Sequence, residues 1–121
     1  MPKENHGQIE KVLLSTVRFL GEQDGPFERI LKNKLVDTLS RFPEVRRAYL
    51  ARATYSEDPS SVVVLGITAD IGNETEIANS IGSVFSSLFN AREHLDLIFL
   101  SAIQELEIKD ACSPFFVNEH P

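Results

Sequence analysis

The side chains best suited to metal binding or nucleophilic catalysis are few and scattered. The three histidines, His6, His94 and His120, have none of the close spacings that hold a zinc ion. Cys112 is the only cysteine, which excludes an internal disulfide and a multi-cysteine metal site. It has no general base beside it in the sequence, and we expect it to act as a small hydrophobic residue near Pro114. We therefore expect no metal site.

Three carboxylates that follow one another closely, Asp70, Glu74 and Glu76, could bind a cation. They lack the regular alternation and the glycine of a calcium-binding loop. They lie where a helix is expected to begin, and negative charge is stabilised there by the helix dipole. The glycines are dispersed and form neither a phosphate-binding loop nor a dinucleotide fingerprint. We expect a protein that is not an enzyme and has no cofactor.

The net charge of −6 is distributed unevenly along the chain. Residues 1–60 contain ten basic and nine acidic residues, whereas residues 61–121 contain two and nine. An acidic protein repels the phosphate backbone, so nucleic acid is not an expected partner. The one basic cluster, Arg41, Arg46, Arg47 and Arg52, is interpreted as a solvated strand edge, because clustered charge usually serves solubility.

Length and composition indicate one globular domain over residues 1–121, with an ordered core over about 13–117 and flexible ends at 1–8 and 118–121. Hydrophobic residues make up 42% and charged residues 25% of the chain. No apolar run approaches the roughly 20 residues that span a bilayer, and the first ten residues do not resemble a secretory signal. A cytoplasmic protein without membrane contact is expected.

Two amphipathic helices are expected, over residues 26–42 and 74–90. The first begins after Asp24-Gly25-Pro26, a favourable start, and ends before Pro43. Its inward stripe is Phe27, Ile30, Leu31, Leu35, Leu39 and Phe42. The second has an apolar stripe of Ile77, Ile81, Val84, Phe85 and Leu88. Its other face is polar but uncharged: Asn79, Ser80, Ser83, Ser86, Ser87 and Asn90. That face either docks a partner or is solvated or covered by the chain's own termini.

Strands are expected over 45–55, 61–69 and 95–100, with an acidic turn between the first two. Val62 to Ile67 is apolar on both faces, which is typical of a central strand. Gly66 in its middle indicates either a bulge or a close backbone approach. The tail is expected to form a short helical turn over 103–110 and then an extended segment.

The segment before the first helix fits either a helix or a strand. The apolar residues between Ile9 and Leu20 have helical spacing, but the stretch 13–20 is also rich in strand-forming types. With a strand there, the order is β-α-β-β-α-β. That order predicts an α+β, ferredoxin-like two-layer sandwich, with two helices on one face of an antiparallel sheet. RNA binding through such a sheet is not favoured, since the central strand carries no aromatic residue.

Several of these residues together resemble the C-terminal domain of the enhanced-serine-sensitivity protein SseB. They are Pro43-x-Val45, Ala48-Tyr49-Leu50, the acidic start of the last strand at Asp96, and Pro114-Phe115-Phe116. The resemblance covers about residues 13–117 and implies a strand ending at Gly21 before the first helix. It differs at Phe116, where a tyrosine is usual, and the N-terminal domain of full-length members is not present. The resemblance supplies no catalytic residues.

The sheet face away from the two helices needs a cover, which we expect to be Phe115 and Phe116 or a second copy of the protein. We interpret the chain as a non-catalytic protein-interaction or regulatory domain, with a protein partner or a homodimer. The candidate contact residues are Arg47, Tyr49, Tyr55, Phe115 and Phe116. The alternative is a small-ligand domain that senses an amino acid at a sheet-mediated dimer interface, by analogy of fold alone.

Overall fold

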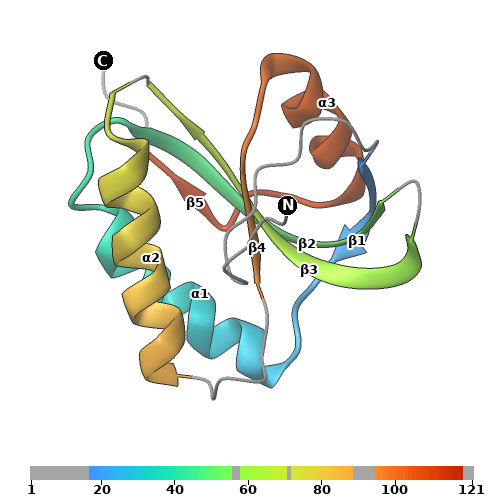
Figure 1. Ribbon diagram of the computed structural model, residues 1–121, viewed down its shortest axis with the longest axis horizontal. Helices are drawn as coiled ribbons and strands as arrows, with labels where there is room; N and C mark the ends of the chain where they lie inside the picture. Colours follow the sequence, from blue (N-terminus) through green and yellow to red (C-terminus); the bar gives the residue numbers. More distant parts are fainter. Residues whose placement is uncertain (1–16, 56–57, 71, 89–94, 119–121) are drawn as a thin grey trace, which may run out of the picture.

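The computed structural model describes residues 17–55, 58–70, 72–88 and 95–118. They form an α+β domain with one mixed five-stranded sheet and three helices (Figure 1). The elements in chain order are β1 (Val17–Glu22), α1 (Pro26–Leu39), β2 (Val45–Tyr55), β3 (Asp58–Ala69), α2 (Glu74–Leu88), β4 (Asp96–Phe99), α3 (Ala102–Ala111) and β5 (Phe116–Val117). None of these helices is long and apolar enough to cross a membrane.

The sheet is built around the β2–β3 hairpin and has the strand order β1-β2-β3-β4. Strand β3 pairs with β2 on one side and with β4 on the other, which confirms that the valine-rich strand is central. Strands β1 and β5 pair with different parts of the remaining edge of β2. Between them, the backbone N–H groups of Gln23 and Phe115 donate to the carbonyl oxygens of Leu50 and Ala48. The outer edge of β2 is thus paired along most of its length.

The α+β class is confirmed, but the ferredoxin-like order and the fully antiparallel sheet were wrong. Strand β1 lies at an edge beside β2, whereas a ferredoxin-like sheet places its first strand inside. Strand β4 runs parallel to β3, with Val64 to Ile67 in register with Asp96 to Phe99. The reason is that α2 carries the chain back before β4 begins, and such a helical crossover joins parallel neighbours.

Helices α1 and α2 cover one face of the sheet (Figure 1). Leu31, Leu35 and Leu39 of α1 pack with Ile77 and Ile81 of α2 in the main core. The strands and Leu95, the residue before β4, contribute the other buried residues of this cluster: Val45, Ala48, Leu50, Leu65, Ile67, Leu95, Leu97 and Phe116. The predicted stripe of α1 is correct at its three leucines. Phe27 and Ile30, in the first two turns of the helix, are exposed instead.

The opposite face of the sheet is covered in part by α3, which lies across from α1 and α2 (Figure 1). Its buried Ile108 packs against Tyr49 and Ala51 of β2. A Cβ added at Gly66 of β3 would lie 3.0 Å from Leu100 and 3.2 Å from Ile108. Gly66 is therefore a site of close approach. Phe116 belongs to the first face, so the expectation that Phe115 and Phe116 cover the second face was wrong.

The structure also resolves part of the ambiguity at the start of the chain. Residues 17–22 form a strand paired with β2, so the strand reading is confirmed there and a helix ending at Gly21 is wrong. Residues 8–16 lie outside the described residues, as do 89–90, the end of the second predicted helix. The tail contains a full helix, α3, that begins with a capping box of Ser101 and Gln104.

Candidate interaction surface

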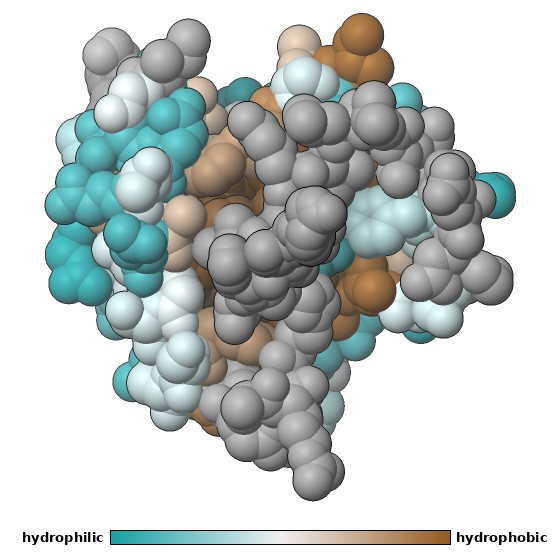
Figure 2. All heavy atoms as spheres, in the orientation of Figure 1, coloured by the Kyte–Doolittle hydropathy of each residue, from teal (hydrophilic) through white to brown (hydrophobic). Residues whose placement is uncertain are grey.

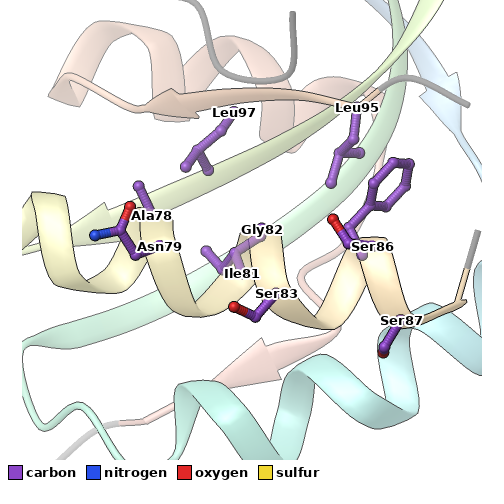
Figure 3. Close-up of a pocket in the computed structure, with 10 residues that line it drawn as sticks. Ala78, Asn79, Ile81, Gly82, Ser83, Ser86, Ser87, Leu95 and Leu97 are labelled. Atoms are coloured by element: carbon purple, nitrogen blue, oxygen red, sulfur yellow. The ribbon is translucent and has the colours of Figure 1, made fainter. Parts of the chain in front are cut away.

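A groove of about 790 Å³ lies between α2 and β4. Figure 3 shows Leu95 and Leu97 pointing from the β4 side toward α2. The lining residues are Ala78, Asn79, Ile81, Gly82, Ser83, Phe85, Ser86, Ser87, Leu95 and Leu97. A volume of this size lies within the range of sites that bind ligands or side chains from a partner.

The groove exists because small residues alternate with large ones along α2. Ile81 packs into the core and forms part of the groove floor. Ala78 and Gly82 are one helical turn apart and leave space on the side toward β4. A Cβ added at Gly82 would meet no atom within 4 Å, so this position is open. The sequence contains this signal in its small residues, but sequence reasoning did not identify it.

The described residues of the groove are apolar on the side of β4 and mostly polar but uncharged on the side of α2. Leu95, directly before β4, and Leu97 of β4 are 5% and 4% exposed and form its apolar side. Figure 2 shows apolar surface directly beside the more polar surface of the α2 side of the molecule. Four residues of the uncharged helix face that the sequence pointed to, Asn79, Ser83, Ser86 and Ser87, line the groove. None of the lining residues that the structure describes is ionisable, so these residues supply neither a general acid nor a base.

A second cluster, of Arg47, Tyr49 and Glu105, joins β2 to α3. Arg47 Nε lies 2.5 Å and Arg47 Nη2 3.2 Å from the two carboxylate oxygens of Glu105. The hydroxyl of Tyr49 donates to Oε2 of the same carboxylate at 2.6 Å. The hydrogen bond from Arg47 holds the pKa of Glu105 below its usual value, and burial raises the pKa of Tyr49. This geometry is that of a structural clamp on α3.

The five predicted contact residues do not form one surface. Tyr49 is 0% exposed and Phe116 is 7% exposed, so neither side chain presents a surface to solvent in this fold. Phe115 is partly buried against the main core. Arg47 is partly exposed but is held by Glu105. These side chains look available in the sequence because nothing there shows that α3 and β5 pack against them.

Tyr55, the remaining predicted contact residue, links two strands that are not neighbours. Its hydroxyl donates to Oδ2 of Asp96 at 2.5 Å, although β3 lies between β2 and β4. Asp96 is 5% exposed and is the first residue of β4. Tyr55 is half-buried. The pair therefore fixes the start of β4 against the end of β2, and it places Tyr55 in a structural role.

The remaining candidates for chemistry are either structural or outside the described part of the chain. His6, His94 and His120 fall outside the described residues. Within those residues, no group of three His, Cys, Asp or Glu side chains is arranged to hold a metal ion. Burial raises the pKa of Cys112 to about 11, which disfavours the thiolate at neutral pH. Of the arginine cluster, Arg46 pairs with Asp70 at 3.0 Å and Arg47 with Glu105.

Comparison with known proteins relates the domain to one family. Residues 10–117 match the family described as the SseB protein C-terminal domain. No curated protein and no solved structure matches the chain. The matched range includes every described helix and strand, with the clamp and the groove. The chain therefore belongs to the SseB C-terminal domain family.

Proposed function

We propose that this domain is a non-catalytic protein-interaction or regulatory domain that binds an apolar segment of a protein partner in the groove between α2 and β4. The observation that carries the proposal is the combination of an apolar side next to and on β4 with described residues on α2 that are polar but uncharged. Formal charges are costly to desolvate, so a surface that is repeatedly covered is better built from serine and asparagine. Apolar side chains of a partner would gain by leaving water there.

The surroundings of Glu105 and Tyr49, whose pKa values are shifted, favour a structural rather than a catalytic role for these two residues. Catalytic acids and bases are usually perturbed within a cleft that a substrate can enter. Glu105 and Tyr49 have shifted pKa values, but each is occupied by the other and by Arg47. None of the three lines the groove. This separation between the hollow and the titratable groups supports binding without chemistry.

The same feature argues against amino-acid sensing in this groove. A free amino acid carries an ammonium and a carboxylate group, and sites that bind it supply charged or strongly polar partners for both. Among the described lining residues, the polar side chains are three serine hydroxyl groups and one asparagine amide. The sheet face on which a dimer interface was expected is in part covered by α3. Thermal unfolding with millimolar serine should show no shift, whereas a ligand at 100 times its Kd stabilises by about 2.7 kcal/mol.

Gly82 offers a direct test of the proposed docking. A phenylalanine at this position projects into the groove, whereas an alanine leaves most of the space open and improves helix propensity. We expect quantitative affinity capture from the native cell to show proteins retained by wild type and Gly82→Ala but lost with Gly82→Phe. Identical sets of captured proteins for all three chains would contradict docking in the groove.

A further inference from the structure

We propose that copies of this domain associate head to tail, with the outer face of α3 in one copy bound to the β1–β2 end of the sheet in the next. Each of the two surfaces combines exposed apolar and charged side chains. The α3 surface consists of Ile103, Leu106, Glu107 and Asp110, and the sheet surface of Arg18, Leu20 and Arg52. None of these residues belongs to the described groove lining, so the inference does not depend on docking in the groove.

The outer face of α3 is apolar in its first turn and acidic in its last. Ile103, Leu106, Glu107 and Asp110 have the i, i+3, i+4, i+7 spacing that places side chains on one side of a helix. Ile103 and Leu106 are 69% and 66% exposed, and both acidic residues are exposed as well. The buried Ile108 holds the other side of the helix against the sheet. Two large apolar side chains that are adjacent and this exposed indicate a surface for contact with another molecule.

The second surface lies on the opposite face of the sheet, at the end away from α1 and α2 (Figure 1). Side chains along β2 alternate between the two faces. Leu50 belongs to the main core with α1 and α2, whereas Ala51 and Ala53 belong to the clusters on the α3 side. Arg52 therefore points to the side of α1 and α2, and it is exposed there. Its exposure shows that the two helices leave this end of the face open.

Strand β1 adds an arginine and a leucine beside Arg52. Arg18 pairs with Thr54, which shares its face with Arg52, so the two arginines are diagonal neighbours about 7–8 Å apart. The register of β1 shifts at Leu20, the extra residue of a bulge opposite Arg52. Arg18 is exposed, and Leu20 is 45% exposed. Within the described part of the chain, no ion pair joins either arginine to a carboxylate.

The two surfaces are complementary in charge and in spacing. Glu107 and Asp110 are three positions apart on a helix, so their Cβ atoms are about 5–6 Å apart. This separation is close to that of Arg18 and Arg52, so both carboxylates can pair with an arginine at once. Arginine binds a carboxylate through two parallel hydrogen bonds, which are of the stronger kind. Each surface has apolar side chains next to its charges, and the same contact removes them from water.

The positions of the two surfaces determine the kind of assembly. They lie on opposite faces of the sheet, so they cannot meet within one copy, and one partner cannot bind both at once. The contact is therefore heterologous and continues from copy to copy unless it closes into a ring. One side of a helix of 10 residues and the end of two strands form a small contact. We expect weak association, of the class that buries less than about 1,200 Å².

The test is the average mass of the full chain, measured by sedimentation equilibrium at concentrations up to about 1 mM, which weak contacts require. The mass of wild type should rise steadily with concentration and should not level off at the dimer. Arg18→Glu with Arg52→Glu makes both surfaces acidic, and Glu107→Arg with Asp110→Arg makes both basic. Each variant alone should associate more than about tenfold more weakly, because like charges then face each other.

An equimolar mixture of the two charge variants should recover the association of wild type. The acidic sheet surface of the first variant then faces the basic α3 of the second, and their two unchanged surfaces still match. Recovery also shows that both variants are folded. The matched control is Arg29→Glu with Lys34→Glu, at exposed positions on α1. It changes the net charge as much as the first variant does and should associate as wild type does.

A third variant tests the apolar part of the contact. Ile103→Ser with Leu106→Ser should weaken association and leave urea unfolding nearly unchanged, because both side chains are exposed. Wild type that stays monomeric at the highest concentration would overturn the proposal. So would a mass that stops at the dimer, or a mixture of the two charge variants that stays monomeric while wild type associates.

Discussion

The hydroxyl of Tyr49 donates a 2.6 Å hydrogen bond to the carboxylate of Glu105, 56 positions further along the chain. Tyr49 is fully buried under α3, and Glu105 is also held by Arg47 from the same strand. This carboxylate therefore attaches α3 to the sheet face that α1 and α2 leave uncovered. Because the bond has a charged acceptor and is largely shielded from water, it is of the stronger kind.

Replacing Tyr49 with phenylalanine keeps the ring in place and removes only the donor. We expect the free energy of unfolding to fall by about 1.5–3 kcal/mol, the range for hydrogen bonds to charged groups. Urea unfolding of the purified domain measures it. Glu107→Gln, at an exposed position on the same helix, is the control and should change stability by less than about 0.5 kcal/mol. Equal effects of the two variants would contradict a clamp role for Tyr49.

The pH dependence of stability tests the same carboxylate. Hydrogen bonds from Arg47 and, to a smaller extent, from Tyr49 lower the pKa of Glu105 below its ordinary value of 4.5. Its stabilising contribution is therefore complete above the unfolded pKa and is lost as the pH falls through the folded pKa. We expect the difference in unfolding free energy between wild type and Glu105→Gln to be constant from pH 7 to about 5.5 and to shrink below pH 4.5. A difference independent of pH would show that the charge of Glu105 does not contribute.

The parts of the fold that follow from local pattern were predictable from the sequence. The strand Val45–Tyr55 was predicted with its observed bounds, and the apolar residues from Val62 to Ile67 identified the central strand. The buried positions Ile77 and Ile81 of α2 follow from helical spacing. In each of these elements, the regularly spaced apolar residues lie on faces that pack against a core. Their spacing therefore indicates directly which side chains are buried.

The parts that depend on partners distant in sequence were not predictable in the same way. α3 buries Glu105 beneath its surface and exposes Ile103 and Leu106, which are 69% and 66% exposed. The hydropathy of these residues alone predicts a buried Ile103 and Leu106 and an exposed Glu105. It does not show that Arg47 and Tyr49 lie on the strand that faces α3 and bind the carboxylate. The direction of β4 was missed for a similar reason, since a short strand carries no mark of which neighbour it pairs with. The groove was hinted at by its uncharged serines, but its shape depends on the open space beside Gly82.

The reactivity of Cys112 tests the proposal that the domain is not an enzyme. Burial raises the pKa of this thiol to about 11, the opposite of what a catalytic cysteine requires. Only the thiolate reacts with alkylating reagents, so at pH 8 the modification rate should be about a hundredfold lower than for the urea-unfolded chain. Iodoacetamide labelling followed by mass spectrometry measures both rates. A rate in the native protein equal to or above that of the unfolded chain would indicate an activated thiol.

Gly66 and Gly82 lie in different packing environments, and we expect substitutions at the two positions to change stability in opposite directions. At Gly66 a Cβ would already be 3.0 Å from Leu100 and 3.2 Å from the buried Ile108, so valine must displace α3 or these side chains. We expect Gly66→Val to lower the free energy of unfolding by about 1–3 kcal/mol, the usual cost of overpacking. At Gly82 a Cβ meets no atom within 4 Å. Gly82→Ala should therefore raise the free energy of unfolding by up to about 1 kcal/mol, because alanine has the higher helix propensity.

Both variants are measured by urea unfolding under identical conditions, with the slope of unfolding free energy against urea checked for constancy. Gly66→Ala is the smaller companion change and should lie between wild type and Gly66→Val. If Gly82→Ala destabilises the domain as Gly66→Val does, the space beside α2 is filled in solution by something that a methyl group disturbs.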